Sequence, residues 1–201
     1  MTDPPLAADA ARQELYAIMR GEAPFEEKVH AALDLGKRYL GVDNGHFTRI
    51  DEETSHWEAL VSTDSEEGQF PPGLELDLST TYCRRTIEAS TPIALANVPE
   101  QGWEDDPAFE EHGLHCYHGT AVVVHEEPYG TVCFVSEDPR DIAFSESETM
   151  FAELIARMVE RELEHEQLEA QLTRQSNLAT VLNRVLRHNI RNDMTVIRGY
   201  T

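Results

Sequence analysis

Lysine is scarce in this chain of 201 residues, and acidic residues outnumber basic ones. Lys28 and Lys37 are the only lysines among 16 bases, which face 38 acids and leave a formal net charge of -22 at pH 7. A surface this acidic repels nucleic acid and anionic lipid, so we expect neither as a partner. The same composition predicts a halophilic protein that stays hydrated in concentrated salt, where repulsion is screened; an ordinary acidic protein is the alternative.

Long apolar runs and a rich set of cysteines are also missing. The longest aliphatic run covers residues 121–124, far short of the ~20 residues that span a bilayer. Residues 1–11 lack the basic, apolar layout of a signal peptide, so we expect a cytoplasmic protein without a membrane span. The three cysteines, Cys83, Cys116 and Cys133, lie on apolar segments, which favours reduced, buried thiols over a disulfide framework.

The apolar spacing predicts helices and strands that share one core. Helices are expected over residues 6–20, 25–40 and 79–89, and strands over residues 45–51, 56–62, 92–98, 116–125 and 129–136. We expect a loop over 64–73, an irregular or weakly helical connection over 99–113 and a turn at 126–128. Ser145 with Glu148 forms a capping-box pattern, which predicts a helix from residue 147 to about 173 or, unbroken, to 197. This order predicts an α+β fold, with an antiparallel sheet covered by helices.

Three segments in the second half of the chain carry a family resemblance. They are residues 116–124 (CYHGTAVVV), 128–134 (PYGTVCF) and 144–148 (FSESE). Together they resemble the second half of a GAF domain, in which a tyrosine-x-glycine strand enters the sheet and phenylalanine-serine opens the last helix. The resemblance covers residues 22–165 and implies a GAF-like sensor domain there, a sensory module for a small molecule or another domain, with the ligand unknown. The apolar spacing places an N-terminal helix within residues 1–21, and it predicts a coiled-coil linker with the start of a further helix over 166–201.

Cys116 and Tyr117 are candidates for ligand contact in that module. Bilin-binding relatives attach their pigment through a cysteine near a histidine in this region, where the present chain has His115 and His118. However, strand alternation sends Cys116 and His118 to one face and Tyr117 to the other. These side chains cannot converge on one metal ion, so we expect no metal site. A buried structural cysteine is the simpler interpretation of Cys116.

Cys83 is the other candidate, because Arg84 and Arg85 follow it directly. Neighbouring cations lower the pKa of a thiol and favour the reactive thiolate. Arg84 could also pair with an anionic ligand. The alternative is a packed cysteine beside two solvated arginines.

The last helix has an apolar face that a finished domain cannot bury. The residues at 4-3-4-3 spacing are Leu168, Leu172, Gln175, Ala179, Leu182, Leu186 and Asn189. This pattern predicts a parallel homodimer through the C-terminal helix. The alternative is a helix that folds back on its own domain.

Residues 187–193 (RHNIRND) resemble the H-box of sensor histidine kinases, in the form associated with haloarchaeal members. The resemblance implies that His188 accepts a phosphoryl group, because a neutral imidazole is nucleophilic near neutral pH. Arg187 and Arg191 would steady the phosphate, and Asn192 matches a polar residue used in dephosphorylating a response regulator. Asn189 stands where the family usually has an acid, so a general base is missing there.

These observations predict the sensory and dimerisation front part of a two-component sensor histidine kinase. Its partners would be an ATP-binding kinase domain, which uses ATP and Mg²⁺ and which we expect to be missing from this chain, and a response regulator. We expect no cofactor in this chain itself. The alternative is a stand-alone GAF module that binds a ligand or dimerises without phosphotransfer, and a third interpretation is a redox sensor through Cys83 or Cys116.

Overall fold

The computed structural model describes residues 6–89 and 91–198, with side chains described up to Leu182 and at Arg184. Its elements are α1 (Ala8–Arg20), α2 (Phe25–Leu40), β1 (Asn44–Asp51), β2 (His56–Ser62), β3 (Glu75–Asp77), the 3₁₀ helix η1 (Leu78–Thr80), α3 (Cys83–Glu88), β4 (Ile93–Leu95), α4 (Pro107–His112), β5 (Cys116–Val124), β6 (Glu127–Ser136) and α5 (Glu146–Arg198). The chain divides into two compact units, Met1–Glu162 and Leu163–Thr201, and α5 contributes to both.

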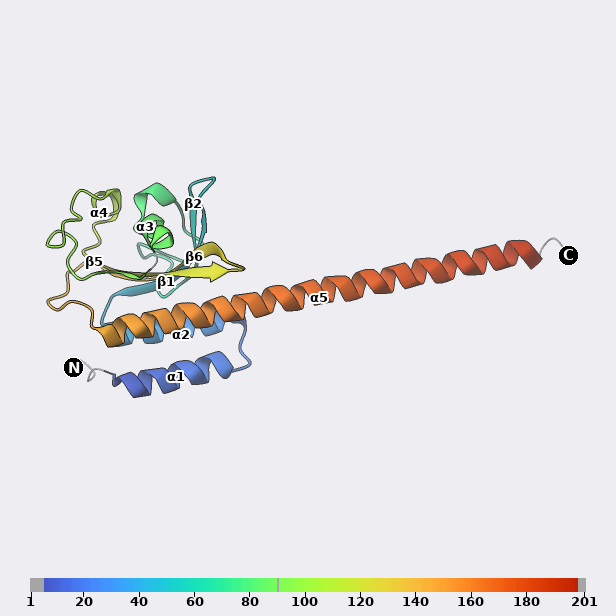
Figure 1. The fold of residues 1–201 in the computed structure, drawn as a ribbon, viewed down its shortest axis with the longest axis horizontal. Coiled ribbons are helices and arrows are strands. Elements are labelled where there is room, and N and C mark those ends of the chain that lie inside the picture. Colours follow the sequence, from blue (N-terminus) through green and yellow to red (C-terminus); the bar gives the residue numbers. More distant parts are fainter. Residues whose placement is uncertain (1–5, 90, 199–201) are drawn as a thin grey trace. The chain divides into compact units, whose positions relative to one another are not determined.

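The six described strands form one antiparallel sheet in the order β3-β2-β1-β6-β5-β4. Helix α2 and the first turns of α5 cover one face, which we call the helix face, whereas α3 and α4 lie over the other, the loop face (Figure 1). Helix α1 packs outside α2, where Arg38 donates to Glu14 at 2.8 Å. The predicted α+β class, with its antiparallel sheet and long C-terminal helix, is confirmed. Every helix in the described part of the chain is too short or too polar to traverse a lipid bilayer.

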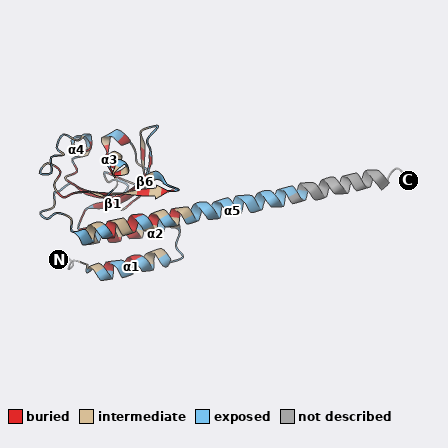
Figure 2. Cartoon of the chain, in the orientation of Figure 1, coloured by how far each residue is buried: buried red, intermediate tan, exposed pale blue. Residues whose placement is uncertain are grey.

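The sheet is closely packed on both faces, since residues 130–136 of β6 are all buried, and the side of α2 that faces it carries buried residues (Figure 2). Phe134 points toward Gly36 of α2, and a Cβ added at Gly36 would lie 2.4 Å from the Phe134 ring and 2.8 Å from Ile155 of α5. Glycine at this position therefore lets α2 approach both the sheet and α5. Near the other end of α2, an ion pair between Lys28 and Glu162 joins α2 to α5.

The capping box at the start of α5 is present as predicted. The Ser145 N–H donates to Glu148 Oε2 at 2.7 Å, and the Glu148 N–H donates to Ser145 Oγ at 3.3 Å. The two bonds satisfy free backbone groups of the first turn. Helix α5 continues unbroken to Arg198, which agrees with the longer of the two predicted extents.

The prediction was wrong in two places between β2 and α3. The helix expected from residue 79 is a 3₁₀ turn capped by Asp77, which accepts from the Ser79 N–H at 2.9 Å, and α3 begins only at Cys83. Strand β3 follows the predicted loop over 64–73 and was not foreseen. It is three residues long, which is too short for a periodic signal.

The turn between β5 and β6 also differs from the prediction. It lies at His125 and Glu126, whose φ angles of 54° and 69° are left-handed, as a two-residue hairpin requires. Pro128 belongs to β6 and pairs with Val123. Proline is tolerated there because β1 pairs with β6 only from Gly130 onward, so no ladder bond is lost on that side.

The loop face is closed by a second apolar core that contains a histidine. His46 of β1 is 3% exposed, stacks on Phe70 at 5.5 Å and meets the edge of Trp57 at 5.7 Å. Its Nδ1 has no hydrogen-bond partner among the described residues. Burial lowers the pKa of His46 from 6.5 to about 4, against a smaller opposing effect of the Asp64 charge.

Replacing His46 by phenylalanine should reduce the loss of stability in mild acid. The folded pKa lies below the unfolded one, so as the pH falls from 6.5 toward 4 the unfolded chain binds a proton that the folded chain rejects. For one such histidine the free energy of unfolding drops by about 2 kcal/mol between pH 7 and pH 5. Urea unfolding at both pH values measures the drop, which His46→Phe should make smaller by that amount.

Phe70→Leu is the matched control, since it disturbs the same aromatic contacts without removing a titratable group. It should lower stability at both pH values equally. An unchanged drop in His46→Phe would contradict a neutral histidine in this core.

Candidate functional site

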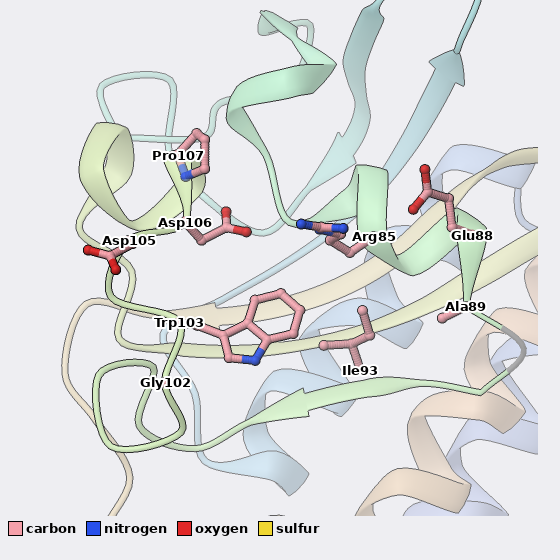
Figure 3. A pocket seen from close by; sticks show the side chains of 9 residues that line it. All are labelled: Arg85, Glu88, Ala89, Ile93, Gly102, Trp103, Asp105, Asp106 and Pro107. Carbon is pink, nitrogen blue, oxygen red and sulfur yellow. The ribbon is translucent and has the colours of Figure 1, made fainter.

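An open groove of ≈ 560 Å³ lies beside α3, between β4 and the loop that leads into α4. Its lining residues are Arg85, Glu88, Ala89, Ile93, Gly102, Trp103, Asp105, Asp106 and Pro107 (Figure 3). The volume falls within the range of small-molecule sites. The groove is therefore a candidate ligand site of the first unit.

A partly buried ion pair fixes one wall of this groove. Arg84 Nη2 lies 2.5 Å from Asp106 Oδ2, and the two side chains are 19% and 8% exposed. Asp106 also accepts from the Ala108 N–H at 3.0 Å, capping α4, which has Pro107 in its first turn. Arg84, a predicted ligand contact, is thus used to hold the loop against α3.

The groove itself offers groups of both charges around an aromatic ring. Arg85 is exposed and makes no ion pair with any described residue. Glu88 and Asp105 lie at opposite ends of the groove, with Trp103 and Ile93 between them (Figure 3). Such a set can pair with an anionic and a cationic group of one small molecule and cover its apolar part.

Trp103 is held in place by the core behind it. Its ring lies 6.2 Å from that of Tyr82, in an edge-on arrangement, and it packs against the buried cluster of the loop face. One side of the indole therefore anchors the loop, and another lines the groove.

Beneath α3 the loop face leaves a cavity of only ≈ 20 Å³. Tyr117 fills much of this region: it is 2% exposed, and its hydroxyl lies 2.6 Å from Thr86 Oγ1. Gly119 leaves room for it, because a Cβ there would lie 2.1 Å from the Tyr117 hydroxyl. Burial raises the pKa of Tyr117 well above 10. Tyr117 therefore packs the core and does not reach the groove.

Cys116 and His118 lie on the helix face, opposite Tyr117, as strand alternation leads one to expect. His118 Nε2 lies 3.4 Å from Thr149 Oγ1 of α5. Cys116 is fully buried, and burial raises the pKa of its thiol to about 12. Neither side chain lines the groove. Among the described residues, no three His, Cys, Asp or Glu side chains are grouped closely enough to hold a metal ion.

Cys83 is buried at the start of α3 and faces Cys133 of β6, with 3.4 Å between the sulfurs. Burial raises the pKa of the Cys83 thiol, but hydrogen bonds to its sulfur outweigh this and lower it overall. The two following arginines, which the sequence suggested as the cause, point elsewhere: one pairs with Asp106 and the other lines the groove. The sequence interpretation missed Cys133, because the contact joins residues 50 positions apart.

The predicted phospho-acceptor region lies at the far end of α5. The backbone of His188, Arg187, Arg191 and Asn192 is helical. Their side chains lie outside the described residues.

Comparison with known proteins places this architecture in a family. The model of the GAF domain matches residues 24–163. The GAF domain of a phosphoenolpyruvate-protein phosphotransferase from Acinetobacter has a TM-score of 0.65 and 12% identity, over 82% of this chain and 97% of that one. Its counterpart from Coxiella burnetii has a TM-score of 0.64 and 17% identity, over 83% and 99%.

The chromophore-binding domain of Stigmatella aurantiaca phytochrome P1 has a TM-score of 0.61 and 12% identity, over 79% of this chain and 60% of that one. No curated protein matches the sequence. At these identities the solved structures establish a shared fold alone, whereas the family model spans more than half of the chain. The chain therefore belongs to the GAF domain family of sensory, ligand-binding modules.

Proposed function

We propose that this chain is the sensory and dimerisation front part of a two-component sensor histidine kinase, in which the GAF domain controls phosphorylation of His188. One observation carries the proposal: α5 begins inside the GAF core and continues without a break past His188 to Arg198. A sensor and a phospho-acceptor on one helix need no separate connection between them. The sequence around His188, which resembles an H-box, supplies the chemistry.

A chain of contacts supports transmission from the groove to α5. Ile93 of β4 lines the groove, and the Ala96 carbonyl, directly after the end of this strand, accepts from the Arg140 N–H at 2.8 Å. Arg140 Nη2 in turn donates to Glu148 Oε1 of α5 at 2.6 Å. A ligand that shifts β4 would therefore act on the first turn of α5. We infer that the signal travels as a change in packing or rotation along this helix.

The chemical step would place a phosphoryl group on the imidazole. A neutral ring nitrogen of His188 attacks the γ-phosphorus of ATP, an N–P bond forms, and the bond to the leaving ADP oxygen breaks. An ATP-binding domain with Mg²⁺ supplies the nucleotide. Arg187 and Arg191 would steady the phosphate charge, and Asn192 would assist dephosphorylation of a response regulator.

His188→Gln should abolish phosphorylation of the chain by an ATP-binding histidine-kinase domain added in trans, because glutamine offers no nucleophilic nitrogen. Labelling from γ-³²P-ATP, followed by acid treatment, measures the acid-labile phosphoramidate. His165→Gln is the matched control, since it removes an exposed histidine from the same helix. Undiminished labelling of His188→Gln, or an equal loss in the control, contradicts the assignment.

We further propose that the helix associates with a second copy of itself. Leu168, Leu172 and Leu182 are 55%, 57% and 54% exposed, and Leu178 and Val181 are comparably exposed beside them (Figure 2). Large apolar side chains at heptad spacing are normally buried in a coiled coil. A parallel dimer would bring the two His188 regions together at one end.

Leu172→Asp with Leu182→Asp should convert the dimer to a monomer, because two carboxylates would lie in the apolar seam. Sedimentation equilibrium measures the change in mass. Ala170→Asp with Asn177→Asp adds the same charge on the opposite side of the helix and should leave the dimer intact. A monomeric parent chain, or equal dissociation of both variants, contradicts the dimer.

The same measurement at low and at molar KCl addresses the halophilic character that we propose from the composition. A formal net charge of -22 opposes association of two copies unless salt screens it. Association should therefore strengthen as KCl is raised.

A second candidate function, a ligand-binding module without phosphotransfer, is favoured by the groove alone. Native mass spectrometry of the purified chain should then detect a retained small molecule that is released on denaturation. Arg85→Gln should lower its occupancy, because Arg85 lines the groove, whereas Arg12→Gln on α1 should not. A retained ligand in a chain whose His188 accepts no phosphate would favour this candidate. Equal ligand occupancy in both variants would show that the ligand does not bind in the groove.

A further inference from the structure

We propose that Cys83 and Cys133 form a reversible disulfide, which makes the centre of the GAF core a modification site for a small hydroperoxide. The two sulfurs lie 3.4 Å apart, and both side chains are buried. A disulfide bond is about 2.05 Å long, so the sulfurs need to approach by about 1.3 Å. The inference concerns the first unit and does not depend on His188.

The sulfur of Cys83 is surrounded by hydrogen-bond donors. Trp57 Nε1 donates to it at 3.2 Å, Thr131 Oγ1 at 3.2 Å and the Tyr117 hydroxyl at 3.7 Å. An indole N–H can only donate, so it favours the charged form of the sulfur. This is an environment for a thiolate, built without any cation.

Cys133 has the opposite character. Its thiol donates to Thr131 Oγ1 at 3.1 Å, and burial raises its pKa well above 9. The hydrogen bonds to Cys83 lower the pKa of that thiol in spite of burial. The pair therefore loses its first proton at Cys83, while Cys133 keeps its own. One sulfur is ready to attack an oxidant, and the other is ready to resolve the product.

The space beside Cys83 selects the oxidant by size. The small cavity of ≈ 20 Å³ is lined by Cys83 together with Trp57, Phe70 and Tyr117, among other residues. A volume of roughly 10–15 Å³ holds one water molecule, so hydrogen peroxide, which is only slightly larger than water, is near the upper limit. A peptide disulfide such as oxidised glutathione is far too large to enter.

The reaction balances in two steps. The Cys83 thiolate attacks one peroxide oxygen, an S–O bond forms, the O–O bond breaks, and the departing hydroxide takes up the proton that Cys83 released on ionisation and leaves as water. The Cys133 sulfur then attacks the sulfenic sulfur of Cys83, an S–S bond forms, the S–O bond breaks, and the hydroxide leaves as a second water with the Cys133 proton. Two thiols are oxidised, and one peroxide is reduced to two waters.

The short helix α3 is the part that can move to close this bond. Cys133 is fixed in the middle of β6, paired with His46 of β1 on one side and Gly119 of β5 on the other. Cys83 begins a helix of six residues that has no side-chain cap at its start. Arg85 and Glu88 on this helix line the groove, so closure of the disulfide would shift two groove residues.

Hydrogen peroxide should convert the folded wild-type chain to a form with two fewer alkylatable thiols. After treatment, alkylation in denaturant and intact-mass measurement should show one modified cysteine in place of three, with no added oxygen, and dithiothreitol should restore all three. Peptide mapping should place the cross-link between Cys83 and Cys133. Oxidised glutathione should not produce this product.

Three variants separate the roles of the cysteines. Cys116→Ser is the matched control and should form the cross-link at the wild-type rate, since Cys116 lies on the helix face with a raised pKa. Cys133→Ser should stop at a Cys83 sulfenic acid, which dimedone traps. In Cys83→Ser, the Cys133 thiol should react at least about tenfold more slowly than Cys83 does.

Three modified cysteines in peroxide-treated wild-type protein, or a cross-link that includes Cys116, would overturn the proposal. Equal cross-linking by oxidised glutathione would overturn the size selection. The wild-type experiment needs no variant, so a variant that fails to fold does not affect it.

Discussion

The close contact between α2 and the sheet at Gly36 and Phe134 is the constraint on which the first unit depends. Without a side chain at Gly36, the Phe134 ring can occupy the space between α2 and α5, and Ile155 packs beside it. Helix α5 is therefore seated on the same face as α2, next to the strand that carries Cys133 on its opposite face. A displacement of side chains on one face of β6 shifts the strand and therefore affects the packing on its other face, because protein interiors are densely packed.

The two faces of the sheet carry different features of the domain. The helix face holds the start of α5 through the capping box and through Arg140, whereas the loop face keeps the groove and the paired thiols. Large aromatic side chains fill the loop-face core, so little room remains directly above the sheet. A ligand-sized groove lies at its margin, beside α3.

Local signals in the sequence were sufficient for the fold. Helical periodicity fixed α2 to the residue, alternation located β5 and β6, and Ser145 with Glu148 marked the start of α5. Features that depend on distant contacts were not accessible, such as the partner of Cys83, which lies 50 residues away. The sequence singled out Cys83 because arginines follow it, whereas the groups that donate to its sulfur, on Trp57, Tyr117 and Thr131, are distant in the chain.

The lengths of the outermost strands have a consequence for assembly. Strands β3 and β4, which form the two edges of the sheet, are three residues long each. An edge of that length presents few free backbone groups and gives a poor template for adding a strand from another molecule. Addition of a strand from another molecule directly onto β3 or β4 is thereby discouraged.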